Sequence, residues 1–249
     1  MKSFIDLTGK TFMVTGATSG IGYEICSQIS IYGGKCIGIG RDSEKLDSMS
    51  DALQGFSGIS YDLSNLESLD GLIEQLEIPL DGIVHSAGIV QLQPIKFLNI
   101  DLLNKIRTVN YDSIVMIISK LLKKKKINKN SSIVFISSIA AEMGMKGNFM
   151  YSSTKAALNS TAKVFASELA SQNIRVNTIA PGQVETALTE EISLTVSAEA
   201  ILFDRQKYPL GYGKPEDVAN LSLFLLSDKS RWITATTITI DGGRSTILN

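Results

Sequence analysis

Short apolar segments alternate with amphipathic segments along most of the chain. The apolar segments have the length of strands and fall at residues 11–15, 35–39, 58–61, 82–85, 132–137, 174–179 and 236–240. Helical periodicity is found between them, at residues 21–32, 43–53, 66–76, 102–125 and 151–171. Strands that are apolar throughout and are separated by amphipathic helices indicate a parallel sheet that is covered on both faces.

The order of these segments also predicts how the chain is connected. Because crossovers between parallel strands are right-handed, the alternation favours a doubly wound α/β fold of the Rossmann type, with three layers. No linker, repeat or low-complexity segment divides the 249 residues. We therefore expect a single domain over residues 1–249 with a sizeable core.

Charge and cysteine content exclude several classes of protein. A net charge of −1 provides no basic field for nucleic acid. Cys26 and Cys36 give neither a disulfide framework nor the spacing of metal ligands, so we expect two small core residues and no metal site. The longest apolar stretch, residues 114–122, is too short to span a bilayer. We expect a cytoplasmic protein without a membrane partner.

A glycine-rich turn separates the first predicted strand from the first predicted helix. Glycines at this place allow a tight turn and let backbone N–H groups approach a pyrophosphate, which the helix N-terminus also attracts. The turn therefore predicts a dinucleotide site. The residues expected to contact the cofactor here are Gly16, Thr18, Ser19, Gly20, Ile21 and Gly22.

The end of the second predicted strand bears on the choice of cofactor. A preference for an unphosphorylated ribose usually places an acidic residue there, but this chain has Gly40 followed by Arg41. A guanidinium can pair with a 2′-phosphate, so the sequence favours NADP(H) over NAD(H). Ser19 supplies no second cation and Asp42 can accept a ribose hydroxyl, which leaves NAD(H) as an alternative.

Tyr151 and Lys155 lie four residues apart in a predicted helix, and Ser138 ends a predicted strand. Positions i and i+4 share a helix face, so we expect the Lys155 ammonium beside the Tyr151 ring. A neighbouring positive charge is expected to lower the pKa of the phenol from about 10 toward the working range of an acid–base catalyst. Ser138 can donate a hydrogen bond to a substrate oxygen while Tyr151 moves the proton.

Together these motifs resemble those of the short-chain dehydrogenase/reductase family. The resemblance covers nearly the whole chain, because the motifs occur in the family's order. The matching segments are Thr15–Gly22, Asp62, Ala87-Gly88, Asn110, Ser138 with Tyr151 and Lys155, residues 175–182, and Asp241-Gly242-Gly243.

The resemblance implies a seven-stranded parallel sheet, an NAD(P)-dependent oxidoreductase acting between a carbonyl and a secondary alcohol, and a homotetramer. Asn110 matches the family's asparagine, which holds a water in a proton relay with the lysine. The remaining cofactor contacts implied are Asp62, Leu63, Ser86, Ala87, Gly88, Tyr151, Lys155, Pro181, Gly182, Val184 and Thr186.

One motif departs from the family pattern. Where the family often has Asn-Asn-Ala-Gly, this chain has His85-Ser86-Ala87-Gly88, which puts local rigidity of the sheet in doubt. His85 is the only histidine, and its place at the end of a buried strand favours a satisfied core residue. Serine–histidine hydrolase chemistry is then excluded, since no other histidine exists.

The substrate is less defined by the sequence. Length and motif order are similar to those of 3-oxoacyl-acyl-carrier-protein reductases, although Gln172-Asn173 lies where those reductases often carry a basic residue. Sugar, polyol or steroid-like alcohols are alternative substrates, and a nucleotide-binding sensor without turnover is an alternative function. An extended-type epimerase is disfavoured, because the chain lacks room for a larger C-terminal domain.

Three further segments bear on substrate and partner. Residues 187–207 correspond to the family's substrate lid. Met143, Met145, Phe149 and Met150 offer an apolar wall near Tyr151, or else belong to the core or a subunit contact. Lys123–Lys126 is either an exposed helix C-terminus, which we favour, or a docking patch for acyl carrier protein.

Overall fold

The computed structural model describes residues 4–186, 189 and 197–246. A single sheet runs through the molecule, with strand order β3-β2-β1-β4-β5-β6-β7 and every neighbouring pair parallel. The strands are β1 (Thr11–Thr15), β2 (Lys35–Gly40), β3 (Phe56–Ser60), β4 (Leu80–His85), β5 (Ile127–Ile136), β6 (Arg175–Pro181) and β7 (Thr237–Ile240). The prediction of a seven-stranded, doubly wound parallel sheet is confirmed.

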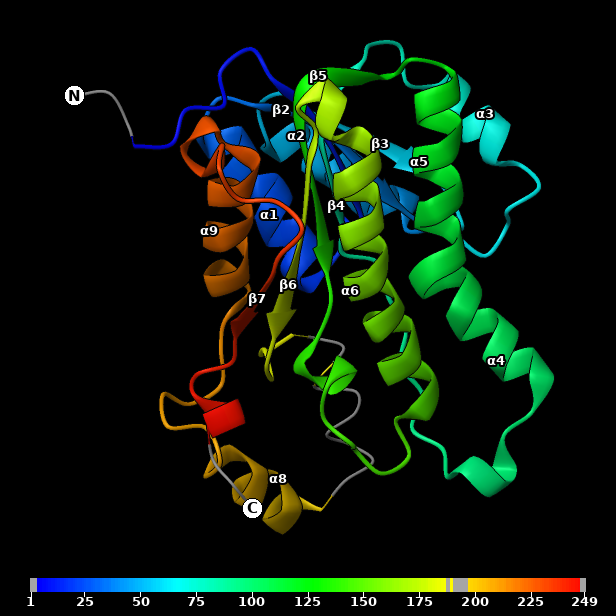
Figure 1. Ribbon diagram of the computed structural model, residues 1–249, viewed down its shortest axis with the longest axis vertical. Coiled ribbons are helices and arrows are strands. Elements are labelled where there is room, and N and C mark those ends of the chain that lie inside the picture. The colour runs from blue at the N-terminus through cyan, green and yellow to red at the C-terminus, as the bar shows by residue number, and fades with distance from the viewer. Residues whose placement is uncertain (1–3, 187–188, 190–196, 247–249) are drawn as a thin grey trace.

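Helices cover both faces of this sheet and complete three layers (Figure 1). The helices are α1 (Gly20–Ile31), α2 (Ser43–Ala52), α3 (Leu69–Glu74), α4 (Ile100–Arg107), α5 (Ser113–Lys123), α6 (Phe149–Leu169), α8 (Ala198–Arg205) and α9 (Pro215–Leu226). Buried residues of α1, α2 and α9 pack in one core cluster. Those of α3, α5 and α6 pack in the other, on the opposite face.

The helix expected at residues 102–125 is divided. It consists of α4 and α5, joined by a π-helical turn at Thr108–Asp112 that contains the buried Asn110. Such turns are rare and often mark functional sites, because the extra residue displaces side chains from the regular helix. Helix α9 was not predicted, although Pro215 at its first turn and Asp217, whose carboxylate accepts from Lys214 N at 2.7 Å, are helix-start signals.

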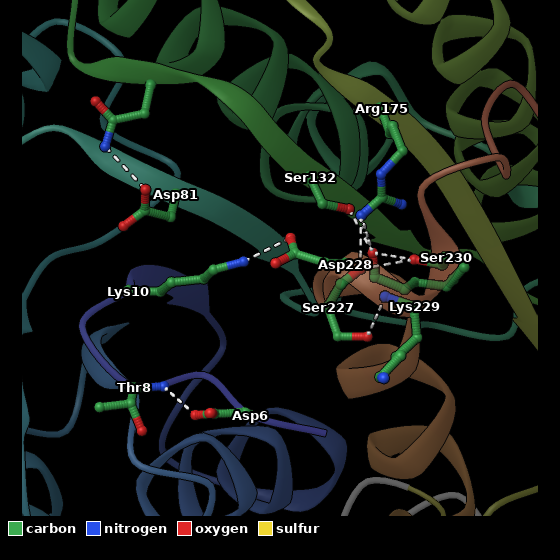
Figure 2. A network of polar contacts seen from close by, with 12 residues as sticks. Asp6, Thr8, Lys10, Asp81, Ser132, Arg175, Ser227, Asp228, Lys229 and Ser230 are labelled. Atoms are coloured by element: carbon green, nitrogen blue, oxygen red, sulfur yellow. Dashed lines mark hydrogen bonds and ion pairs between the residues drawn. The ribbon is translucent and has the colours of Figure 1, made fainter. Parts of the chain in front are cut away.

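The amino ends of the strands are tied to the end of α9 by a network of polar contacts (Figure 2). The Arg175 guanidinium, at the start of β6, donates to the carbonyls of Leu225 at 2.7 Å and Ser227 at 3.1 Å. Ser132 Oγ donates to the same Leu225 carbonyl, and Lys10 pairs with Asp228 at 2.7 Å. These bonds satisfy carbonyls that the C-terminus of α9 leaves free.

Two of the four lysines in the run at the end of α5 form contacts within the molecule. Lys124 pairs with Glu74 at 3.3 Å, and Lys126 Nζ donates to the carbonyls of Ile73 and Leu76 at the end of α3. Lys120, one turn earlier, pairs with Asp70. This supports the interpretation of the run as a helix C-terminus.

Both cysteines are free core residues, as expected. Burial, together with the neighbouring Cys26, raises the pKa of the Cys36 thiol well above its ordinary value, so this thiol is unreactive. Within the described residues, no helix is long and apolar enough to cross a membrane, and no group of acidic, histidine or cysteine side chains is arranged to hold a metal ion.

Candidate active site

Two adjoining cavities lie at the carboxyl ends of the central strands, where ligands bind in folds of this type. The larger, of about 480 Å³, extends from the glycine turn past Arg41 to Val109. The smaller, of about 230 Å³, is lined by Ser138, Tyr151 and Lys155. Gly88 lines both cavities, so the predicted cofactor turn and the predicted catalytic residues share one continuous cleft.

The glycine turn is shaped by close backbone contacts. A Cβ at Gly16, which has φ +71°, would lie 2.8 Å from the backbone of Ala87. A Cβ at Gly22 would lie 2.1 Å from the Gly16 carbonyl oxygen. Only glycine fits at these two positions, and the helix packs directly on the turn. The first turn of α1 has no side-chain cap from Ser19 and no acidic residue, so its N–H groups and positive dipole suit an anion.

The outer part of the larger cavity carries the charged residues. Arg41, Asp62 and Leu63, which the sequence analysis assigned to the cofactor site, line it, and Lys105 of α4 lines it as well. A backbone hydrogen bond from Ser64 is the main reason for the lowered pKa of Asp62, and the charges of Arg41 and Lys105 add to it. Lys105 was missed, because only the fold brings α4 to the cavity that the end of β2 also lines.

Asp42 is engaged away from the cavity. Its carboxylate caps α2 by accepting from Lys45 N at 3.0 Å, and it lies 3.8 Å from the Lys45 ammonium. Arg41 has no ion pair among the described residues. The acidic alternative considered from the sequence is therefore committed to a helix cap, while the guanidinium is free.

The smaller cavity brings Ser138, Tyr151 and Lys155 together. Lys155 Nζ lies 5.5 Å from the centre of the Tyr151 ring, as the helical spacing predicts. It donates to the Ile136 carbonyl at 2.8 Å and is 3% exposed, and this burial lowers the pKa of Lys155 to about 8. Ser138 Oγ accepts from Ala140 N at 3.1 Å, so its hydroxyl can donate either to Tyr151 or to a substrate oxygen.

The acidity of Tyr151 differs from the expectation. Burial raises the pKa of Tyr151, and a hydrogen bond with Ser138 offsets only part of that rise. The prediction of a lowered pKa is wrong for this structure, because desolvation of the phenolate outweighs the hydrogen bond with Ser138. Tyr151 is thus protonated at neutral pH, which is the form that donates a proton.

Asn110 lies near Lys155 and is bonded to the backbone of Ile89. Its Oδ1 accepts from Ile89 N at 2.8 Å, and its Nδ2 donates to the Ile89 carbonyl at 2.9 Å. A Cβ on Gly88 would lie 3.3 Å from Lys155 Nζ and 3.6 Å from Asn110 Oδ1, so the lysine and the asparagine both approach this glycine. The side-chain amide is occupied by structural bonds.

His85 is a fully buried, satisfied residue, as predicted. Burial, with a smaller effect from the Lys155 charge, lowers the pKa of His85 to about 3, so the ring is neutral at pH 7. Its Nε2 lies 3.0 Å from the Asn110 carbonyl and must donate, and its Nδ1 accepts from Thr15 Oγ1 at 2.8 Å. Sequence reasoning missed this link from β1 through β4 to the π-helical turn.

The remaining predicted residues are distributed over the two cavities. The larger is lined by Gly16, Thr18, Ser19, Ala87 and Gly88, and the smaller by Ile21, Ser86, Pro181, Gly182, Val184 and Thr186. Gly20 and Gly22 line neither cavity.

The expected apolar wall is only partly present. Of its four residues Met145 lines the smaller cavity, whereas Met150 is buried and Phe149 is exposed. Residues that the sequence did not single out also line it, among them Leu92, Asn148, Gln183 and Tyr208, and so does Thr189 of the predicted lid. Residues 187–188 and 190–196 of the predicted lid lie outside the described residues, and the later part of the predicted lid contains α8.

The chain is similar to known proteins along nearly its whole length. A family model described as enoyl-(acyl carrier protein) reductase matches residues 16–245. The 3-oxoacyl-[acyl-carrier-protein] reductases FabG of Rickettsia felis and Aquifex aeolicus are 36% and 33% identical to it, with 96% of this chain and 98% of each relative covered.

Solved structures agree with these relatives. A short-chain dehydrogenase/reductase (glucose/ribitol dehydrogenase) from Brucella melitensis is 29% identical, with a TM-score of 0.89 and coverage of 98% of this chain and 99% of that one. A putative NAD(P)-dependent gluconate 5-dehydrogenase from Beutenbergia cavernae with bound NADP is 27% identical, with a TM-score of 0.89 and coverage of 97% and 99%. With its sheet, glycine turn and Ser138–Tyr151–Lys155 cavity, this chain belongs to the short-chain dehydrogenase/reductase family and is a nicotinamide-dependent oxidoreductase that interconverts carbonyls and alcohols.

Proposed function

We propose that the protein reduces 3-oxoacyl thioesters with NADPH, using Tyr151 as the proton donor. The observation that carries this proposal is that Ser138, Tyr151 and Lys155 line one cavity, which opens into the cleft of the glycine turn. The substrate class is supported by the similarity to FabG reductases over 96% of the chain.

The cleft has the features that a nicotinamide dinucleotide requires. Close packing of Gly16 on Ala87 lets the backbone reach a pyrophosphate, and the N-terminus of α1 provides unpaired N–H groups for it. Asp62 and Leu63 would contact the adenosine end, and Pro181, Gly182, Val184 and Thr186 the nicotinamide end, where Ser86 and Ile21 also lie. The bound cofactor supplies the hydride that reduces the carbonyl carbon.

The preference for NADP(H) is part of the proposal. It is supported by the free Arg41 guanidinium, the neighbouring Lys105 and the use of Asp42 as a helix cap. A fluorescence titration with NADPH and NADH tests it. Tighter binding of NADPH is expected, and clearly tighter binding of NADH would refute the assignment of Arg41.

The protein's own groups then handle the proton. Ser138 Oγ–H donates to the carbonyl oxygen and stabilises the negative charge that develops there. Tyr151 transfers its proton to that oxygen, and the Lys155 ammonium, 5.5 Å from the ring, stabilises the resulting phenolate. We assign Asn110 the role of holding a water on the path by which Tyr151 is reprotonated through Lys155. Because its side-chain amide is occupied, this water would bind the second lone pair of the Asn110 carbonyl, beside the bond from His85 Nε2.

Assays of cofactor oxidation with soluble 3-oxoacyl thioesters and with ketoses test the substrate class. Faster turnover of the thioesters is expected. The competing class, sugar or polyol alcohols, is supported by the glucose/ribitol and gluconate dehydrogenases among the similar structures. Preferential turnover of those substrates would replace the 3-oxoacyl assignment.

We propose acyl carrier protein as the physiological carrier of the substrate, and the cytoplasm as the place where the two proteins meet. The chain itself is proposed to be one domain with a substrate lid at residues 187–207. Since Lys124 and Lys126 are bonded to α3, their part in docking would require these bonds to break. Direct binding measured at two salt concentrations tests the partnership, because an acidic carrier protein held by charge binds more weakly at high salt.

We also propose a homotetramer. It is supported by the family resemblance and by exposed apolar side chains, among them Met116 of α5, Val164 of α6, Leu210 and Trp232, which subunit contacts would cover. Sedimentation analysis is expected to give four times the chain mass of 27.0 kDa, and a monomer at micromolar concentration would contradict it.

A further inference from the structure

One buried amide in the smaller cavity has an unused hydrogen-bonding atom. Asn148 Oδ1 has no hydrogen-bond partner, although the residue is only 6% exposed. Four other buried side-chain atoms of the described residues share this property, on Gln93, Ser131, Asn159 and Arg244. Of these five residues, Asn148 alone lines one of the two cavities of the candidate site.

The amide is held close to the proposed proton donor. Asn148 directly precedes α6 and lies three residues before Tyr151, and both side chains line the smaller cavity. Its backbone carbonyl accepts from Ser152 N at 2.9 Å, but its side chain does not cap the helix. The preceding Gly147 is fixed by a 2.7 Å bond from Gln93 N to its carbonyl.

The other end of the amide is equally available. Asn148 Nδ2 has only a weak contact, 4.0 Å from Met145 Sδ. A rotation of about 180° about the last side-chain bond exchanges oxygen and nitrogen, so the amide can present either an acceptor or two N–H donors to the cavity. A buried polar group is expected to have a partner, and the cavity is the place from which one can come.

We propose that Asn148 determines substrate specificity: its Nδ2–H donates a hydrogen bond to a second carbonyl of the substrate, in addition to the carbonyl that is reduced. The inference rests on the proposed function, since a 3-oxoacyl thioester carries its thioester carbonyl two carbons from the reacting one. That part of the substrate offers acceptors and no donor, which selects the N–H side of the amide. A simple ketone lacks this group and leaves Asn148 unpaired.

The expected effect is a selective loss. A site that uses a hydrogen bond to hold its substrate discriminates against the analogue that lacks the partner. For one neutral bond, we expect the wild type to prefer ethyl 3-oxobutanoate over 2-hexanone by about tenfold in kcat/KM, equal to about 1.4 kcal/mol. Asn148→Leu, which has similar volume and no polar group, is expected to lose this preference.

Steady-state assays with both substrates test the inference, with Asn159→Leu as the matched control. Asn159 lies on the same helix and also has an unpaired Oδ1, but it lines neither cavity. A tenfold fall for the ketoester alone in Asn148→Leu, with no change in Asn159→Leu and no lower Tm, supports the inference. Asn148→Ala is expected to give the same selective loss if Asn148→Leu does not fold.

Two results would overturn the inference while the proposed function stands: equal losses on both substrates, or no loss on the ketoester. If the wild type turns over neither ethyl 3-oxobutanoate nor a 3-oxoacyl thioester, the proposed function itself fails, and the inference fails with it.

Discussion

The strands begin at one end of the sheet, here called the amino edge, and finish at the other, the carboxyl edge. These two ends of the sheet differ in how completely their polar groups are paired. At the amino ends of the strands, Arg175, Lys10 and Ser132 are bonded to the end of α9 (Figure 2), with Ser131 Oγ as an unpaired exception. At the carboxyl ends, Lys155 is buried with a lowered pKa and Asn148 Oδ1 has no partner. The comparison teaches that one edge stabilises the fold, whereas the other keeps polar groups available for a ligand at a cost in stability.

The largest expected effect is at the carboxyl edge. Tyr151→Phe removes the proton donor but keeps the ring, so kcat for carbonyl reduction should fall by about 10²–10⁴-fold with little change in Tm. Tyr23→Phe, which changes an exposed ring of α1, is the control. Near-normal turnover in Tyr151→Phe would show that a group other than Tyr151 donates the proton.

The converse pattern is expected at the amino edge. Arg175→Leu leaves backbone carbonyls with fewer donors and should lower the free energy of unfolding by about 2–3 kcal/mol. Urea unfolding measures this loss. The kcat of the folded enzyme should stay within about twofold, and a large fall in kcat at unchanged stability would erase the distinction between the edges.

Cofactor choice sharpens the account of the carboxyl edge. Arg41→Ala would remove the proposed charge-assisted bond to the 2′-phosphate, so the Kd for NADPH should rise by about 10–100-fold while the Kd for NADH stays the same. The control is Lys45→Ala, the next cation along the chain, which does not line the cavity. Equal weakening for both cofactors would mean that Arg41 does not read the phosphate.

The smallest expected effect comes from the ion pair in the amino-edge network, as distinct from the hydrogen bonds to carbonyls. Lys10 and Asp228 form an ion pair in which Asp228 is 81% exposed, and such pairs contribute at most about 1 kcal/mol. Lys10→Met should therefore lower Tm by no more than about 2–4 °C. If Lys10→Met lost as much stability as Arg175→Leu, the ion pair would stabilise this edge as much as the hydrogen bonds to the carbonyls, contrary to the account.

The sequence predicted the parts of the molecule that depend on local pattern. The seven strands follow from apolar segments, and the Lys155 ammonium lies beside Tyr151 because helical spacing places it there. The pKa of Tyr151 was mispredicted, because spacing gives proximity to a charge but not the extent of burial.

What the sequence missed depends on tertiary packing. The π-helical turn around Asn110 interrupts a segment whose periodicity is that of one helix, and nothing in the periodicity marks the extra residue. Lys105 and Asn148 enter the site because α4 and the start of α6 fold over the strand ends. By contrast, α9 could have been predicted, because Pro215 in its first turn is a helix-start signal.

The most direct test of the central claim compares the wild type with Lys155→Met from pH 7 to pH 10. Burial lowers the pKa of Lys155 to about 8 from its unfolded value of 10.5. Between these values the unfolded chain binds more protons, so stability rises with pH. The wild type should therefore gain stability relative to Lys155→Met in urea unfolding above about pH 8. Its rate of carbonyl reduction should fall over the same interval. A stability difference that does not change with pH, or a rate that does not fall, would contradict the claim that this edge gives up stability for function.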